Sequence, residues 1–497
     1  MRVVTGRTDH VVVVGAGLAG LSAALHLLGA GRRVTVVERD AVPGGRAGRL
    51  DLGGYRFDTG PTVLTMPELV DEALHAVGES LGDRLDLRPV DPAYRARFAD
   101  GSTLDVHADA GAMEAEVRRF AGPREAAGYR ELRRWLTRLY RVERDAFIGA
   151  NFDSPLDLLT PRLAELAALR GFARLEPSVA RFLSDERLRR VFTFQSLYAG
   201  VPPHRALAAY AVIAYMDTVA GVYHPEGGMR ALPDALAAAA QDAGAEFRYR
   251  TRVAWLERIG GRVTAVRTAR GERIPCDAVV LTPDLPTSYR LLGHRPRRPL
   301  PITWSPSAVV LHAGVTRTWP ELAHHTVFFG AAWRRTFDEL TRRGTLMSDP
   351  SLLVTAPPGQ GLFVLAPAPN LRTSAIDWER VGPAYREELV RTLEARGLTG
   401  FGSAIEVERL VTPRDWAARG LAAGTPFSAA HTFAQTGPFR PRNLVLDNAV
   451  LAGCGTTPGV GVPPVLVSGR LAAQRITGAV GAAARRPVVG RRSRTRR

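Results

Sequence analysis

The stretch HVVVVGAGLAGLSAALHLLGAGRRVTVVERD, residues 10 to 40, decides the fold class of this 497-residue chain. Its first apolar run is typical of a buried strand, and RVTVVE at 33 to 38 is typical of a second one. Between them, leucines recur at the spacing of one helix face: Leu18, Leu21, Leu25 and Leu28. Strand, helix and strand in this order form a βαβ unit, so we predict an α/β fold with a Rossmann-like domain.

The turn between the first strand and the helix carries a nucleotide-binding pattern. Gly15, Gly17 and Gly20 form GxGxxG, in which the first glycine permits the turn and the second lets the backbone approach a pyrophosphate. The third lets the helix pack closely on the strand. Glu38, at the end of the second strand, can accept hydrogen bonds from a ribose. We therefore predict an adenosine dinucleotide without a 2′-phosphate, with a purely structural glycine turn as the alternative.

Composition excludes several functions. The formal charge is +17, but seven of the charges lie in the last thirteen residues, RRPVVGRRSRTRR, so we expect a basic tail and no nucleic-acid partner. All 66 basic residues are arginines, which excludes a lysine Schiff base and a lysine general base. Cys276 and Cys454 fit no metal-ligand spacing, so we expect no metal. They favour a reducing cytoplasm, with a single disulfide as the alternative.

One long apolar stretch, residues 206–223, approaches the length of a membrane span. Asp217 lies inside it, so a core helix or a cavity wall is the preferred interpretation. The N-terminus lacks the charged-then-apolar pattern of a signal peptide, which predicts that the chain is not exported.

Two further segments belong with the nucleotide-binding unit. Residues 227–284 predict a helix followed by short alternating strands. Near the C-terminus, NLVLDNAVLA at 443–452 predicts one buried strand, GCGTTPGVGVPP at 453–464 a glycine-rich turn, and the residues that follow a helix. Nucleotide-type and substrate-type segments therefore alternate along the chain. We assign 1–85, 226–290 and 426–480 to a cofactor domain, 86–225 and 291–425 to a substrate domain of mixed sheet and helices, and 481–497 to a disordered tail.

Residues 43–69, PGGRAGRLDLGGYRFDTGPTVLTMPEL, contain a second glycine and arginine cluster. Together with GAGLAG and Glu38, the stretches GGRAG and DTGPTVLT resemble FAD enzymes of the bacterial-type phytoene desaturase family, within the flavin amine oxidase-like superfamily. The resemblance runs from about residue 10 to about residue 478. It includes LRRVFTFQSLYAG at 188–200, YHPEGGM at 223–229, LAHHTVFFG at 322–330, VLAPAPN at 364–370 and GCGTTPGVGVP at 453–463. The family often has His where this chain has Thr457, so we assign that side chain no role.

The resemblance implies that FAD is the cofactor and that the segment 453–463 closes over the flavin. Val253 would meet the adenine, with an ordinary strand valine as the alternative. The residues implied to contact FAD are Gly15, Gly17, Gly20, Glu38, Gly45, Arg46, Gly60, Pro61, Val253, Gly453, Gly455, Gly461 and Val462.

The family's activity implies desaturation of a long apolar carotenoid precursor, most simply phytoene, to a conjugated product such as lycopene. No side chain accepts a hydride, so flavin N5 must take it. A hydrocarbon has no polar group to bind, so the substrate site should be a long apolar tunnel. Candidate walls, which ordinary helix core would explain equally well, are Phe194, Tyr198, Tyr210 and Tyr215. No acid or base is assigned, because Asp157 fits a helix cap with Ser154. His324 and His325 should point to opposite strand faces.

The expected partners and the alternative functions follow from the same chemistry. A carotenoid substrate comes from a membrane, so we expect a cytoplasmic, peripherally membrane-associated protein. The sequence does not identify its electron acceptor, for which oxygen and a quinone are the candidates. The arginines of 485–497 would contact an anionic leaflet, or else form a solubilising extension. Another carotenoid substrate and a flavin amine oxidase are the alternatives, although many amine oxidases carry a lysine near the flavin. A non-enzymatic prenyl-lipid carrier would not need Gly15, Glu38 and Arg46.

Overall fold

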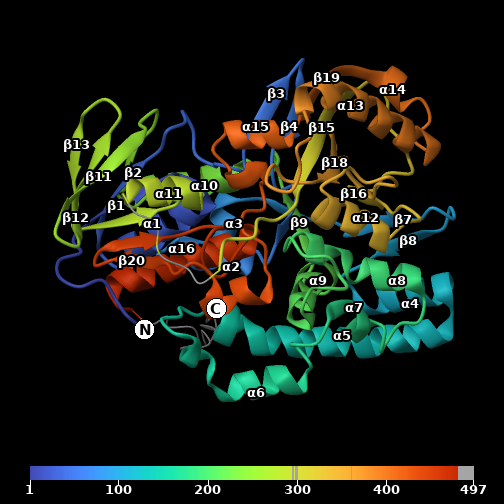
Figure 1. The fold of residues 1–497 in the computed structure, drawn as a ribbon, viewed down its shortest axis with the longest axis horizontal. Coiled ribbons are helices and arrows are strands. Elements are labelled where there is room, and N and C mark those ends of the chain that lie inside the picture. The colour runs from blue at the N-terminus through green and yellow to red at the C-terminus, as the bar shows by residue number, and fades with distance from the viewer. Residues whose placement is uncertain (294–295, 297–299, 360, 480–497) are drawn as a thin grey trace, which may run out of the picture.

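A six-stranded sheet built from three distant parts of the chain forms the first layer of the protein (Figure 1). The computed structural model describes residues 1–293, 296, 300–359 and 361–479. The strands, in spatial order, are β10 (Glu246–Arg248), β2 (Arg33–Val37), β1 (His10–Val14), β14 (Ala278–Leu281), β21 (Ala449–Leu451) and β20 (Leu444–Leu446). All neighbours are parallel except β20 and β21. The α/β fold is confirmed, and Glu38 directly follows β2.

Helix α1 (Leu18–Gly29) lies between α16 (Val462–Thr477) and α10 (Ala231–Asp242) and contacts both. Its buried residues occur on nearly all sides, which explains the high apolar content of the segment. The contact with α16 is close because a Cβ on Gly469 would lie 2.4 Å from Ala19 O. The first and last parts of the chain therefore pack as one unit. The face of the six-stranded sheet opposite α1 is covered by a small antiparallel sheet of β11 (Val253–Ile259), β12 (Arg262–Thr268) and β13 (Arg273–Pro275).

A seven-stranded mixed sheet forms the second large layer, at the upper right of Figure 1. Its order is β19 (Ile405–Val411), β15 (Ser307–Val315), β18 (Leu362–Ala368), β17 (Leu352–Thr355), β16 (His325–Phe328), β7 (Tyr94–Arg97) and β8 (Thr103–Val106). All seven strands fall inside the ranges 86–225 and 291–425, and the strands of the first sheet fall inside the other ranges. The domain boundaries themselves remain a prediction, and the tail 481–497 lies outside the described residues.

Helices cover the second sheet from below in Figure 1. The main ones are α4 (Ala110–Ala121), α5 (Pro123–Glu143), α6 (Pro161–Ala168), α8 (Glu186–Val191) and α9 (Ala211–Thr218), with the 3₁₀ turns η2 (Pro155–Leu158) and η3 (Phe194–Leu197) between them. The apolar stretch 206–223 is interrupted: a 3₁₀ turn at Ala208–Tyr210 precedes α9, and β9 (Val222–Pro225) follows. None of the helices in the described ranges has both the length and the apolar character to cross a bilayer.

One prediction about the C-terminal segment is wrong in detail. NLVLDNAVLA forms two antiparallel strands, β20 and β21, instead of one. The Asn448 side chain stabilises the turn between them, because its Nδ2 donates to Val263 O at 2.7 Å and to Asp277 O at 2.6 Å. Its Oδ1 accepts from Val263 N at 2.8 Å. A short apolar run does not reveal such a turn, because the backbone groups that Asn448 contacts lie 171 and 185 residues earlier in the chain.

Candidate cofactor and substrate cavity

A cavity of about 1840 Å³ begins at the carboxyl ends of β1 and β2 and continues between the second sheet and the helical layer. Its volume exceeds the roughly 300–1,000 Å³ of an ordinary ligand pocket, so it has room for a dinucleotide and a second molecule. Twelve of the thirteen predicted cofactor residues line it: Gly15, Gly17, Glu38, Gly45, Arg46, Gly60, Pro61, Val253, Gly453, Gly455, Gly461 and Val462. The exception is Gly20.

The three glycines of GxGxxG have three different surroundings. Gly15 has φ +106°, and a Cβ there would lie 2.2 Å from Thr282 Oγ1. Gly20 does not line the cavity, because its Cα hydrogen faces the turn, where a Cβ would lie 2.0 Å from Gly15 O. At Gly17, by contrast, a Cβ would meet nothing within 4 Å. The open space at Gly17 lies at the N-terminus of α1, where an anionic pyrophosphate is favoured.

Glu38 is buried, and its carboxylate holds the glycine turn. Oε2 accepts a 2.7 Å hydrogen bond from Ala16 N, and Oε1 accepts a 2.9 Å hydrogen bond from Asp40 N. Each oxygen retains further lone-pair capacity, and the side chain lines the cavity. The carboxylate can therefore accept ribose hydroxyl groups while it stabilises the turn.

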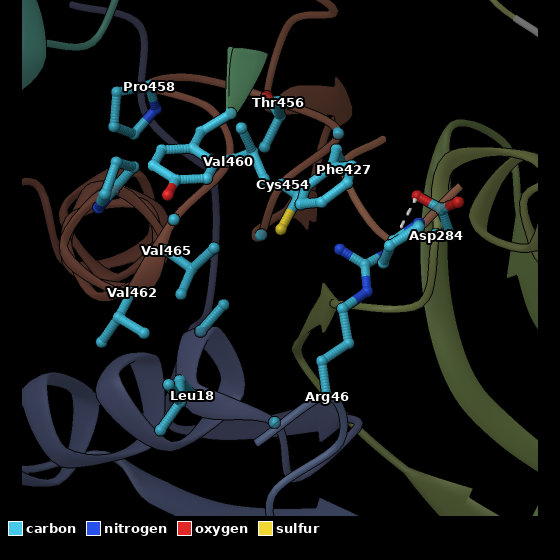
Figure 2. Close-up of a pocket in the computed structure, with 18 of the residues that line it drawn as sticks. Leu18, Arg46, Asp284, Phe427, Cys454, Thr456, Pro458, Val460, Val462 and Val465 are labelled. Carbon is cyan, nitrogen blue, oxygen red and sulfur yellow. Dashed lines mark ion pairs between the residues drawn. The ribbon is translucent and has the colours of Figure 1, made fainter. Parts of the chain in front are cut away.

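A second glycine turn lies directly against the first. Gly44 forms an isolated parallel bridge with Gly17, and its N–H donates to Ala16 O at 2.9 Å. Figure 2 shows Arg46 extending from this turn across the cavity toward Asp284, with Cys454 and Phe427 beside it. The Arg46 Nη2 to Asp284 Oδ1 distance is 3.7 Å. The guanidinium thus brings a fixed positive charge to the wall where a pyrophosphate or an anionic flavin would lie.

The segment 453–463 closes the cavity on the far side, and a buried arginine fixes its path. Arg440 is 2% exposed; its Nε donates to Thr456 O at 3.0 Å and its Nη2 to Cys454 O at 2.7 Å. The same guanidinium also donates to Gln435 O and Ala429 O. Helix α16 begins within this segment, at Val462, and Val462 and Val465 face the cavity opposite Leu18 of α1 (Figure 2).

The family follows from comparison with known proteins. A family model described as flavin containing amine oxidoreductase matches residues 18–477. A phytoene dehydrogenase from Streptomyces griseus is 68% identical over 492 residues, which cover 96% of this chain and 97% of the relative. This chain is a member of the phytoene desaturase family. It lies within the flavin-containing amine oxidoreductases and is an FAD-dependent oxidoreductase of the type that acts on CH–CH groups.

Two other proteins extend the comparison. A lycopene-forming phytoene desaturase from Pseudescherichia vulneris is 34% identical over 485 residues, covering 93% of this chain and 98% of that protein. A solved structure of a putrescine oxidase variant superposes with a TM-score of 0.59 at 16% identity, covering 95% of this chain and all of that one. The second likeness shows that this phytoene desaturase family member has the fold of that oxidase. FAD fits the observed site, because an open glycine turn, a buried acidic group and a fixed arginine occur together.

Three of the four predicted substrate residues line the cavity of this desaturase family member: Phe194, Tyr198 and Tyr210. Phe194 packs edge-to-face against Tyr198, with ring centroids 5.9 Å apart. The prediction for Tyr215 is corrected, because its side chain points away from the cavity. Its ring stacks on that of Tyr140, with ring centroids 4.3 Å apart. It lies on α9 beside cavity residues, but its direction from the helix carries it toward α5.

Several predictions about individual side chains can also be compared with the structure. Ser154 and Asp157 form the expected capping box. Cys276 and Cys454 are both free thiols. His324 and His325 do not separate as expected, because both contact Thr62: His325 Nε2 lies 2.8 Å from Thr62 Oγ1, and His324 Nε2 lies 3.4 Å from Thr62 O.

Sequence reasoning missed two acidic residues that line the cavity, Asp217 on α9 and Glu143 at the end of α5. Burial raises the pKa of Asp217 to about 8 and raises that of Glu143 well above its usual value. Asp217 stood out in the sequence as a charge within an apolar run, which was the signal available. Glu143 gave no such signal, because it ends an amphipathic helix rich in charges.

Proposed function

We propose that this chain desaturates phytoene to a conjugated polyene such as lycopene. When bound, FAD supplies the acceptor for the hydride that leaves the substrate. The observation that carries the proposal is the continuity of the cavity, from the dinucleotide turn at Gly17 to the aromatic wall at Phe194 and Tyr198. Membership of the phytoene desaturase family supports the same reaction. A lycopene-forming relative makes lycopene the first product to test for.

The cavity wall explains how a hydrocarbon would be held. Beyond the cofactor turn, most lining side chains are apolar, among them Leu163, Leu166, Ile213, Met216, Val327 and Leu353. Each CH₂ group that leaves water contributes only about 0.8 kcal/mol, and less when it leaves lipid. Selectivity would therefore come from the shape and length of the cavity.

The opening of the cavity supports a membrane-associated enzyme. We define the mouth surface as five exposed apolar side chains: Leu156, Leu159, Phe172, Phe433 and Phe439. All except Leu156 line the cavity, and η2 contacts the 3₁₀ turn Gly437–Phe439. We propose that this surface rests on a lipid bilayer at the cytoplasmic side and receives the carotenoid there. The reduced flavin would pass its electrons to oxygen or to a quinone in the same membrane.

The decisive experiment adds this chain to cells that accumulate phytoene, followed by extraction and chromatography of the pigments. We expect a coloured polyene, and the absorption spectrum distinguishes lycopene from less desaturated products. The purified holoenzyme should give the same product from phytoene in liposomes without a nicotinamide cofactor. Unchanged phytoene in both systems would refute the proposal, and a strict requirement for NAD would indicate a different reaction. Oxidation of a diamine such as putrescine instead would favour the amine oxidase alternative.

A further inference from the structure

Two carboxyl groups face a cavity whose substrate end is otherwise largely apolar. Asp217 enters it from α9, and Glu143 enters from the neighbouring helix α5. Burying a carboxylate without a compensating partner is costly, so such groups call for a function beyond packing. Within the described part of the chain, neither forms an ion pair.

Asp217 lies at the aromatic wall where the substrate is expected. Its Oδ2 accepts a hydrogen bond from Gln195 Nε2 at 3.4 Å, and Gln195 lies in the same turn, η3, that carries Phe194. Its Oδ1 is enclosed and makes no hydrogen bond to any described residue. The carboxyl group is thus anchored at one oxygen.

We propose that Asp217 is a catalytic residue that accepts the proton lost in each desaturation. This inference rests on the carotenoid desaturation proposed above. A C–H bond on one carbon breaks with its electron pair, which leaves as hydride to the flavin. The C–H bond on the adjacent carbon breaks when Asp217 takes its proton, and the electrons of that bond form the new C=C bond. The substrate is oxidised by two electrons, the flavin is reduced by two, and Asp217 later releases its proton to solvent.

The acid–base properties of the cavity favour Asp217 over its neighbours. Burial raises its pKa to about 8, while the hydrogen bond from Gln195 and the amides of residues 217 and 218 lower it. A base with a pKa near the working pH combines proton affinity with a usable ionised fraction. Glu143 is a poorer candidate, because no hydrogen bond among the described residues anchors its carboxyl as the one from Gln195 anchors Asp217.

The two cavity histidines are weaker bases than Asp217. Burial lowers the pKa of His325 and of His431 well below the usual histidine value. His325 Nε2 is also engaged by Thr62, and His431 Nε2 accepts a 3.4 Å hydrogen bond from Val460 N. Proton transfer to either would therefore be less favourable.

The groups around Asp217 that could affect its titration come from three elements. Tyr94 of β7 and Tyr198 next to η3 face it, and burial raises the pKa of both phenols, so they stay neutral over the relevant range. From α5, Arg133 Nη1 donates to Thr218 O at 3.3 Å, and Glu143 shares the cavity. We therefore expect an ionisation near pH 8 to report Asp217, and the Glu143 variant described below tests this assignment.

The test compares Asp217→Asn with wild type in the flavin-loaded enzyme under anaerobic conditions. Bleaching of the flavin absorption after mixing with phytoene in liposomes measures a single turnover. We expect Asp217→Asn to slow bleaching at least about hundredfold, the usual range for loss of a general base, with unchanged flavin content. Asp217→Glu should recover part of the rate. In wild type the rate should rise with pH through about 8, because only the ionised carboxylate accepts the proton.

Glu143→Gln is the matched variant, because it removes the second carboxyl at the substrate end of the cavity. It should keep the rise of the rate with pH, whereas Asp217→Asn should lose it. Infrared titration of the flavin-free protein provides a readout independent of turnover: a protonated carboxyl band that disappears near pH 8 should be present in wild type and Glu143→Gln, and absent from Asp217→Asn.

The outcomes separate the two proposals. If wild type bleaches and forms polyene while Asp217→Asn does so within threefold of its rate and with the same pH profile, the role of Asp217 is refuted and the desaturase function stands. If wild type neither bleaches nor forms polyene, the desaturase function fails and the role of Asp217 fails with it.

Discussion

Gly17 and Gly44 lie against each other as the two members of an isolated parallel bridge, so the two glycine turns form one surface. The N–H of Gly44 donates a hydrogen bond to Ala16 O in the first turn. A Cβ on Gly45 would lie 3.4 Å from Gly17 Cα. This contact places two glycine clusters, separated by more than twenty residues, where both could hold one dinucleotide.

Replacing Gly17 with valine should abolish FAD retention. The new side chain would meet nothing in the protein itself and would instead project into the space where the pyrophosphate approaches the backbone. Flavin absorbance released by denaturation measures the loss. Gly82→Val is the control, because a Cβ at Gly82 also meets open space but on an exposed helix away from the cavity. Equal flavin content in both variants would contradict the assignment.

Glu38→Gln should weaken FAD binding by about 1–3 kcal/mol, the scale of hydrogen bonds to a charged group. Titration of the flavin-free protein with FAD measures the affinity, and excess FAD should partly restore activity. Because Glu38 also accepts bonds from Ala16 N and Asp40 N, melting temperatures of the flavin-free proteins must be compared. Lower activity with unchanged affinity for FAD would show that Glu38 has another role.

Arg440→Met should lower the free energy of unfolding by about 3 kcal/mol or more, because buried carbonyl groups lose their donors. The affected acceptors include Cys454 O and Thr456 O in the segment that closes the cavity, so flavin should also dissociate more readily. Thermal unfolding followed by circular dichroism and by flavin fluorescence measures both effects. The exposed neighbour Arg442→Met should stay within about 0.5 kcal/mol of wild type. Equal stability of the two variants would contradict the role of Arg440.

Charges introduced at the mouth surface should weaken binding to liposomes. We expect Leu159→Glu combined with Phe433→Glu to reduce co-sedimentation about tenfold, because burial of each apolar side chain contributes on the order of 1.5–3 kcal/mol when complete. Ile259→Glu is the matched control, since Ile259 is 73% exposed but lies on β11, away from the mouth. Deletion of 485–497 in each background measures any contribution from the tail arginines, which should fade at high salt. Unchanged sedimentation of the double variant would refute the mouth surface as the contact.

The stability of the protein should fall as the pH drops from about 6.5 toward 4, and His312 contributes to this fall. His312 is fully buried, and burial lowers its pKa to about 4. In this window the unfolded chain binds a proton that the folded protein does not, so protonation favours unfolding. Denaturant unfolding measures the difference in free energy of unfolding between His312→Gln and wild type. Between pH 7 and about pH 4, this difference should shift in favour of the variant by as much as about 3 kcal/mol. A constant difference between the two proteins across this range would contradict the assignment.

The sequence was most informative where one short segment determines the structure. The βαβ unit, the three glycines and the Ser154–Asp157 cap depend on neighbours within a few residues, and all three were predicted. The cavity was harder to predict, because its wall combines distant elements. Periodicity placed Tyr215 on a helix but could not show that its ring would stack on Tyr140.

Buried polar groups were the least predictable part of the site. Arg440 is one of 66 arginines, and nothing nearby in the sequence distinguishes it from exposed ones. Its importance depends on four carbonyl groups that only the folded chain brings together. The same holds for Glu143, which is buried although it ends an amphipathic helix rich in charges.

The position of β21 between β14 and β20, and of α16 against α1, has a consequence for biosynthesis. The βαβ unit leaves the ribosome long before the strand β21 and the helix α16, which complete its sheet and cover α1. Until then, apolar surfaces remain open and at risk of aggregation. The nascent chain is therefore a natural client for chaperones, and cofactor capture must wait until β21 and α16 have been made. Because a ligand that binds only the folded state stabilises it, the supply of FAD in the cell should influence how much of the protein accumulates.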